Sequence, residues 1–199
     1  MPQNFLVKAW VRLTHIVYGC WREPLKRLAL IAGLLTVGCW MLLIGPPQFS
    51  TASVPQRFSD PQLEVQTVQD VEDLRLTLGD APSQDRETMR IKLRIDYAFI
   101  AAYVTLLASL GVVQARKGGW LRIVGVAAAL AAVAAGVFDV LENLAIVDVL
   151  DVKIAATTEQ MLAAIRQPSL IKWSLAALSV ALVLLSQFAG VVTGKSRNS

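Results

Sequence analysis

Long uninterrupted apolar runs dominate the chain and predict four helices that cross a membrane. The runs cover 28–45, 97–115, 121–146 and 170–193. An α-helix rises about 1.5 Å per residue, so each run reaches across, or nearly across, roughly 30 Å of hydrocarbon. The third run is the longest, and it carries no charged residue from 123 to 138. The pattern therefore predicts an all-α fold, an integral membrane four-helix bundle.

Polar and apolar positions in the first 27 residues follow a different pattern. Four polar side chains and one glycine recur at spacings of four and three residues and trace one stripe, at Lys8, Arg12, His15, Gly19 and Arg22. This spacing is typical of an amphipathic helix with one narrow polar face. We expect segment 1–27 either to lie in the cytoplasmic headgroup region of the membrane or to pack as a cap under the bundle.

The two longer connections are also compatible with helices. In the loop 46–96, an Asp-Pro pair at 60–61 suits the start of a short amphipathic helix, and nothing interrupts the helical pattern from 84 to 115. This loop is too short and too polar to bury a core of its own, so we expect it to lean on the bundle. The connection 147–169 is helix-compatible, and Pro168 suits the first turn of the fourth span.

Small residues within the third run predict that it is the central helix. Ala128, Ala132 and Gly136 are spaced by four, so they share one face of a helix. Small side chains at this spacing allow neighbouring helix backbones to approach closely in a membrane. The first and fourth runs are rich in Leu, Val and Ile, and we expect them to face lipid.

The composition supports the membrane assignment and the charges indicate its orientation. The chain is 55% hydrophobic and 17% charged. Lysines and arginines precede the first run, stand between the second and third runs, and follow the fourth. These three segments are separated from one another by two or four membrane crossings, so they lie on the same side of the membrane. The positive-inside rule then predicts that both termini are cytoplasmic. The net charge of +4 is mainly a signal of this topology, and we expect no nucleic-acid partner.

The content of histidine and cysteine excludes several classes of catalytic chemistry. The chain has 1 histidine, His15, and 2 cysteines, and it contains no CxxC or GxSxG motif. These counts do not fit a histidine-rich zinc or di-iron site or a Ser-His pair. We expect no cofactor, and the sequence leaves the question of a bound metal open.

Polar residues gather at one depth, near the far end of the third run from its cytoplasmic start. Asp139, Glu142 and Asn143 stand at i, i+3 and i+4 and so share one helix face. Asp139 is 18 residues, or about 27 Å, beyond Leu121, close to the far boundary of the hydrocarbon. Asp96 begins the second run at that same boundary. The spacing predicts a polar pocket at the extracytoplasmic mouth of the bundle.

Other helices bring further polar residues to this depth. Tyr103 follows Asp96 by seven residues and lies two turns deeper on the same face. Arg90, Arg94 and Lys172 stand near the same boundary and are candidate ion-pair partners for the carboxylates. The candidate polar site therefore consists of Asp96, Tyr103, Asp139, Glu142 and Asn143.

Three interpretations of this site follow from the residue types. In the first, Asp139 and Glu142 pair with Arg94 or Lys172 and have a structural role. In the second, the same groups bind a cation or a lipid headgroup. In the third they catalyse a reaction, and carboxylates without histidine or a nucleophile could then bind a hard cation or act as a general acid and base.

Two motifs resemble the paired signature of an uncharacterised family of small four-helix bacterial membrane proteins. The first is D-Y-x-F-x-x-x-Y, which starts at Asp96 and ends at Tyr103, and the second is D-x-x-E-N, which spans 139–143. The arrangement resembles the family over 84–195. In that family a small residue often follows the second tyrosine, whereas Val104 stands here. The resemblance implies that the two motifs form one unit, and it implies no reaction.

Together these observations predict a multi-pass protein of the bacterial cytoplasmic membrane. We expect a non-enzymatic role through contacts between helices, with membrane lipids, or with a protein partner or second copy in the envelope. The competing prediction is a carboxylate site for a cation or lipid headgroup, which could be catalytic. The predicted segments are a cytoplasmic amphipathic segment 1–27, spans 28–45, 97–115, 121–146 and 170–193, extracytoplasmic loops 46–96 and 147–169, and a cytoplasmic tail 194–199.

Overall fold

Four long helices make up nearly all of the structure, a computed structural model. The residues that it describes are 23–44, 70–72, 83–151 and 158–195. The helices are α2 (Pro24–Ile44), α4 (Ser83–Ala115), α5 (Gly119–Asp151) and α6 (Glu159–Lys195). All four are long and apolar enough to cross a membrane, which confirms the predicted all-α fold of four packed, span-length helices. Residues 1–22, which hold the polar stripe of the predicted amphipathic segment 1–27, lie outside the described residues, as does most of loop 46–96.

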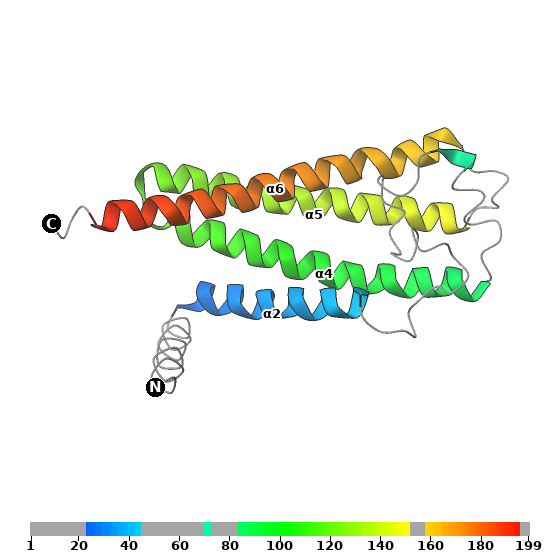
Figure 1. Cartoon of the computed structure of the whole chain (residues 1–199), viewed down its shortest axis with the longest axis horizontal. Helices are drawn as coiled ribbons and strands as arrows, with labels where there is room; N and C mark the ends of the chain where they lie inside the picture. The colour runs from blue at the N-terminus through cyan, green and yellow to red at the C-terminus, as the bar shows by residue number, and fades with distance from the viewer. Residues whose placement is uncertain (1–22, 45–69, 73–82, 152–157, 196–199) are drawn as a thin grey trace, which may run out of the picture.

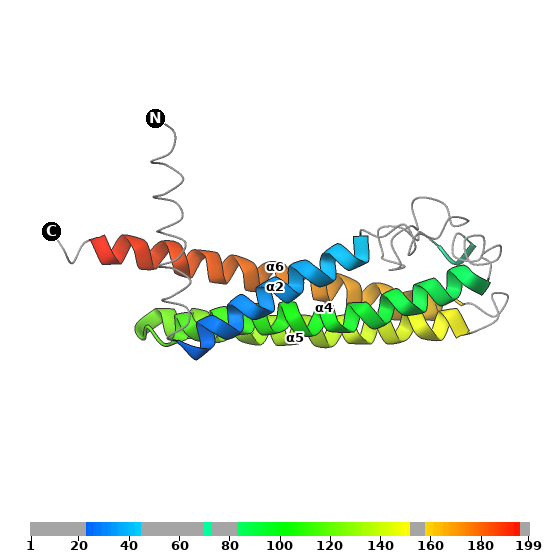
Figure 2. The same cartoon turned by 90° about the horizontal axis from the view of Figure 1, so that it is seen from below.

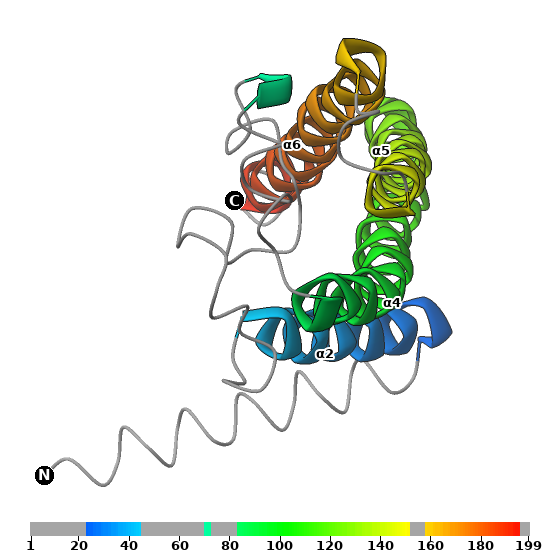
Figure 3. The same ribbon diagram turned by 90° about the vertical axis from the view of Figure 1, so that its right-hand side faces the viewer.

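The helices pack in the order in which they occur in the chain (Figure 1). α5 lies between α4 and α6 and contacts both along its length, while α2 packs against α4 and barely touches α5 or α6. Viewed from one end, the described helices form an open arc with α2 and α6 at its two ends (Figure 3). The arrangement is thus a row of packed helices, with α2 at the edge of a three-helix unit.

Small residues explain why α5 occupies the central place. Ala128, Ala132 and Ala135 are completely buried. At the α4–α5 crossing, a Cβ atom added to Gly125 would lie 2.4 Å from the carbonyl oxygen of Gly111. The two backbones therefore touch, as the predicted packing of small residues requires. On the other side, the Ser179 hydroxyl of α6 donates to the carbonyl of Ala128 at 2.9 Å.

A second close contact between α4 and α5 accommodates the valine at position 104. Val104 of α4 faces Gly136 of α5, where an added Cβ would lie 2.5 Å from a Val104 methyl carbon. The valine side chain on α4 therefore fits against a glycine on α5, which has no side chain, and the two helices remain close.

α2 has a lipid-type surface on most of its circumference. It crosses α4 obliquely (Figure 2), with its Trp40 ring 5.7 Å from that of Phe99. Leu34 and Met41 are 67% and 66% exposed. A helix that is apolar all round is expected to have lipid or another membrane helix on its free faces.

The ends of α4, α5 and α6 that lie away from the α4–α5 turn enclose a compact apolar cluster. We call it the outer core, and its members are Val71, Met89, Leu93, Ile146, Val149, Leu150, Leu162 and Ile165. Val71 comes from loop 46–96, and this described part of the loop leans on the helices as expected. The outer core extends the three-helix unit past the level of the predicted polar site.

The expectation for Pro168 was wrong. The structure starts α6 at Glu159, so Pro168 stands in the interior of the helix and does not occupy its first turn. The reason is that apolar residues such as Leu162 and Ile165 bury themselves in the outer core and extend the helix toward the N-terminus. The proline has no N–H to donate to the carbonyl of Ala164, a local cost that the packing of this stretch offsets.

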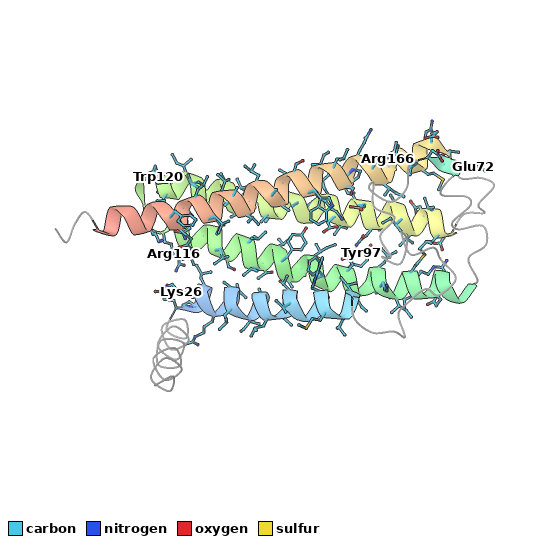
Figure 4. The ribbon with its side chains drawn as sticks, viewed as in Figure 1. Lys26, Glu72, Tyr97, Arg116, Trp120 and Arg166 are labelled. Atoms are coloured by element: carbon cyan, nitrogen blue, oxygen red, sulfur yellow. The ribbon has the colours of Figure 1, made fainter. Side chains whose placement is uncertain are left out.

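The turn between α4 and α5 defines the opposite end of the helices. Gly118 and Gly119 have φ angles of 78° and 57°, which side chains other than glycine rarely adopt. Lys26, Arg116 and Trp120 all lie at this end, whereas Glu72 and Arg166 lie at the other (Figure 4).

Replacing Gly125 by alanine should destabilise the α4–α5 crossing. The new methyl group would have to displace the backbone of Gly111, so we expect a loss of roughly 1–3 kcal/mol in unfolding free energy. Titration of the purified protein in mixed micelles with dodecyl sulfate measures this loss. Gly38→Ala on α2 is the matched control, because nothing lies within 4 Å of an added Cβ there. Equal stability of the two variants would contradict the close approach.

Candidate functional site

Two acidic side chains of α5 share one lysine of α6. The Lys172 Nζ lies 2.8 Å from Asp139 Oδ1 and 2.6 Å from Glu142 Oε2. The three residues are almost fully shielded from solvent, at 5%, 5% and 0% exposure. Asp139 and Glu142 can reach one ammonium group because they are three residues, or about one turn, apart on α5.

Asp139 also connects this pair to α4. The Tyr103 hydroxyl donates to Asp139 Oδ2 at 3.0 Å, while the other carboxylate oxygen accepts from Lys172. One carboxylate thus contacts α4 and α6 from its position on α5. Tyr103 in turn packs its ring against Phe99, with 5.4 Å between centroids, which restricts where its hydroxyl can point.

A second polar contact joins α4 and α5 about one turn farther out. The Asn143 Nδ2 donates to Asp96 Oδ2 at 2.6 Å. Asp96 is 1% exposed, and Asn143 is completely buried. The amide oxygen of Asn143 makes no hydrogen bond within the part of the chain that the structure describes.

The structure therefore brings together all five residues of the candidate site. We call these five together with Lys172 the ion cluster; they are Asp96, Tyr103, Asp139, Glu142, Asn143 and Lys172. The ion cluster lies between the alanine-rich packing on one side and the outer core on the other. Apart from the half-buried Tyr103, its residues are buried among α4, α5 and α6 and do not line an exposed mouth, because the outer core covers them at the end of the helices.

Two of the three cations that the sequence offered as partners lie elsewhere. Arg90 pairs with Asp151 and, at 3.5 Å, with Glu87, both outside the ion cluster. Arg94 is exposed, and the described residues include no ion-pair partner for it. Of the three candidates, Lys172 alone contacts Asp139 and Glu142.

Buried polar residues that the sequence analysis overlooked surround the ion cluster. Lys92 is 4% exposed and stands four residues before Asp96, on the same face of α4. Ser169 is 1% exposed and stands three residues before Lys172 on α6. The helical spacing to Asp96 was a usable signal for Lys92. The signal for Ser169 was overlooked because residue 169 was assigned to the extracytoplasmic loop 147–169.

The arrangement favours holding helices together over binding a metal. Within the described ranges, no group of three or more histidine, cysteine, aspartate or glutamate side chains is placed to hold a metal ion. Lys172 occupies the space between Asp139 and Glu142, where a cation would otherwise bind. In a low-dielectric interior such paired charges attract strongly, and removing one partner is costly.

Comparison with known proteins adds no identification: no protein-family model, curated protein or solved structure matches the chain.

Replacing Lys172 by methionine should strongly destabilise the protein. Asp139 and Glu142 would remain buried without the cation, a loss that typically amounts to about 3–5 kcal/mol. The free energy of unfolding in mixed micelles measures the effect. Lys117→Met makes the same substitution at an exposed lysine and should leave the stability unchanged. An equally stable Lys172→Met variant would rule out the shared ion pair.

Replacing Tyr103 by phenylalanine should have a smaller effect of the same sign. The change removes the hydroxyl that donates to Asp139 and keeps the ring, so we expect a loss of roughly 0.5–1.5 kcal/mol. The same unfolding assay measures it, with the partly exposed Tyr97 changed to phenylalanine as the control. If Tyr97→Phe cost as much as Tyr103→Phe, the contact with Asp139 would have no special weight.

Proposed function

We propose that this chain is a non-enzymatic multi-pass membrane protein that acts through contacts of its helices with lipid, with a partner or with a second copy. The observation that carries the proposal is the bridge from Lys172 to both Asp139 and Glu142. These charged groups of the bundle interior are engaged with one another, which suits a clamp between helices better than an exposed reactive site.

The distribution of apolar side chains supports the same proposal. The two outer helices of the arc carry large exposed residues in the spanning region, such as Leu35 on α2 and Phe188 on α6, which are 56% and 70% exposed. Apolar surfaces of this extent suit lipid or a neighbouring membrane helix. The rigid three-helix unit would then present these surfaces in a fixed arrangement.

We further propose that the protein resides in the bacterial cytoplasmic membrane with both termini in the cytoplasm. The support is that Lys26 and Arg116 flank spans at the end of the helices that holds the α4–α5 turn (Figure 4), while Arg90 and Arg94 at the other end oppose the rule only locally. Basic residues flanking spans are retained on the cytoplasmic side.

Membership of the resembled four-helix family is likewise a proposal. Its support is that the two motifs meet in space, through Asp96 with Asn143 and through Tyr103 with Asp139. Paired motifs that make one set of interhelical contacts are expected to act as a single unit.

The proposed structural role of the ion pairs between Lys172, Asp139 and Glu142 can be tested by removing the two negative charges one at a time. Asp139→Asn and Glu142→Gln keep the shape of each side chain and weaken its attraction to Lys172. We expect both variants to give clearly less monodisperse protein in detergent than the parent, with lower melting temperatures, whereas Asp148→Asn at an exposed position of α5 should behave like the parent. Normal yield and melting temperature for both cluster variants would contradict a structural role.

One observation favours a second candidate, a site for a cation or a lipid headgroup. The amide oxygen of Asn143 is buried beside Asp96 and lacks a hydrogen bond in the described structure, so a small cation could bind to it. This candidate predicts normal yield for the two variants and a melting temperature that magnesium or calcium raises in the parent but not in an Asp96→Asn variant. At a free cation concentration one hundred times the dissociation constant, binding would raise the free energy of unfolding by about 2.7 kcal/mol.

A further inference from the structure

An apolar groove runs between α4 and α5, away from the ion cluster. Its walls and floor come from both helices and contain no polar side chain, and its volume is about 370 Å³. The lining residues are Ile100, Ala101, Val104, Val133, Gly136, Val137, Val140 and Leu141. Sites that bind small ligands typically range from about 300 to 1,000 Å³, so the groove is large enough for part of a lipid chain.

The groove exists because small residues stand where the two helices meet. Gly136 and the buried Ile100 line the groove, and Ala101 contributes only a methyl group to its lining. Val137 is 53% exposed and stands two residues, or about 200° of helix rotation, from Asp139. The groove therefore opens on the face of the α4–α5 pair that points away from Lys172 and α6, toward the surrounding membrane.

An exposed positive charge stands above one end of the groove. Arg94 precedes Ala101 by seven residues, so it lies on the same side of α4 and about 10 Å farther along the axis. Tyr97 stands three residues after Arg94 and four before Ala101, so helical spacing places it between them on this side of α4. Arg94 is exposed and has no ion-pair partner among the described residues. It is thus a basic group near the boundary of the hydrocarbon, where phospholipid phosphates lie.

Within the described residues, Arg94 forms no ion pair with the neighbouring helix. Contacts of Asp96 with Asn143 and of Arg90 with Asp151 fix how α4 and α5 lie side by side. They place Arg94 level with the segment 144–147 of α5, which reads Leu-Ala-Ile-Val. The exposed Asp148 stands one residue beyond this segment and seven after the groove residue Leu141, and no ion pair joins it to Arg94 in the described structure.

We propose that the groove and Arg94 together bind one phospholipid with an anionic headgroup, from the leaflet at the end of the helices opposite the α4–α5 turn. An acyl chain lies in the groove, the phosphate accepts hydrogen bonds from the Arg94 guanidinium, and the Tyr97 ring borders the headgroup. The inference deepens the proposed function by naming one lipid contact, and it involves no residue of the ion cluster.

Binding of short-chain lipids to the purified protein tests the proposal. The probes are dioctanoyl phosphatidylglycerol, dioctanoyl phosphatidylcholine and glycerol 3-phosphate, and native mass spectrometry in detergent measures their binding to the parent and to variants. We expect phosphatidylglycerol to bind the parent about fivefold more tightly than phosphatidylcholine, since one basic group at a membrane surface has an effect of that order. Glycerol 3-phosphate should bind far more weakly, because it has no chain for the groove.

Variants separate the contributions of charge and groove. Arg94→Gln should abolish the preference for phosphatidylglycerol, and Arg94→Lys should keep most of it. Ala101→Phe should fill the groove and weaken binding of both lipids, whereas Ala127→Phe, at an exposed position of α5 outside the groove, should bind like the parent. Melting temperatures without lipid should match the parent, because each changed side chain is exposed.

Three results would overturn the proposal. They are equal binding of the two lipids by the parent, an unchanged preference in Arg94→Gln, and unchanged affinity in Ala101→Phe. Binding of glycerol 3-phosphate as tight as that of phosphatidylglycerol would exclude the groove as well. None of these results would bear on the proposed structural role of the ion pairs around Lys172. That role would be contradicted separately, by normal folding of Asp139→Asn and Glu142→Gln.

Discussion

The need to compensate buried charge governs this structure. Asp139 and Glu142 on α5 are withdrawn from solvent, and they remain compatible with a membrane interior because Lys172 of α6 contacts both. Two ionised carboxylates without that ammonium group would be costly to bury. Tyr103 adds α4 to the same contact, so the positions of three helices are set by one carboxylate and its partners.

The rest of the fold follows from this constraint. The side chains of the ion cluster reach one another only if α5 lies close to both neighbours, and the completely buried Ala128 and Ala132 permit that approach. Beyond the ion cluster, apolar residues such as Leu162 close the outer core and keep water from the charges. α2 takes no part in this network. It lies against α4 at the edge of the arc, where its exposed apolar surface suits lipid or a partner.

Some of this arrangement was predictable from the sequence, because hydropathy and helical spacing act locally. The apolar runs predicted the four long helices, and the i, i+3, i+4 spacing of Asp139, Glu142 and Asn143 predicted their common face. The choice of Lys172 over Arg90 and Arg94 was not predictable, since it depends on how α6 is rotated against α5. The burial of the site was missed because the outer core is assembled from helix ends assigned to loops. The packing of α2 against α4 could not be predicted from the hydropathy pattern, because a helix that is apolar all round has no preferred face.

A double-mutant cycle between Lys172 and Glu142 tests the central claim most directly. The unfolding free energies of the parent, Lys172→Met, Glu142→Gln and the double variant in mixed micelles yield the coupling energy of the pair. The shared ion pair predicts a favourable coupling energy of about 1–3 kcal/mol. The double variant should then lose less unfolding free energy than the two single variants lose together. Strictly additive losses would show that the two residues do not interact, and would contradict the account of how the three helices are held together.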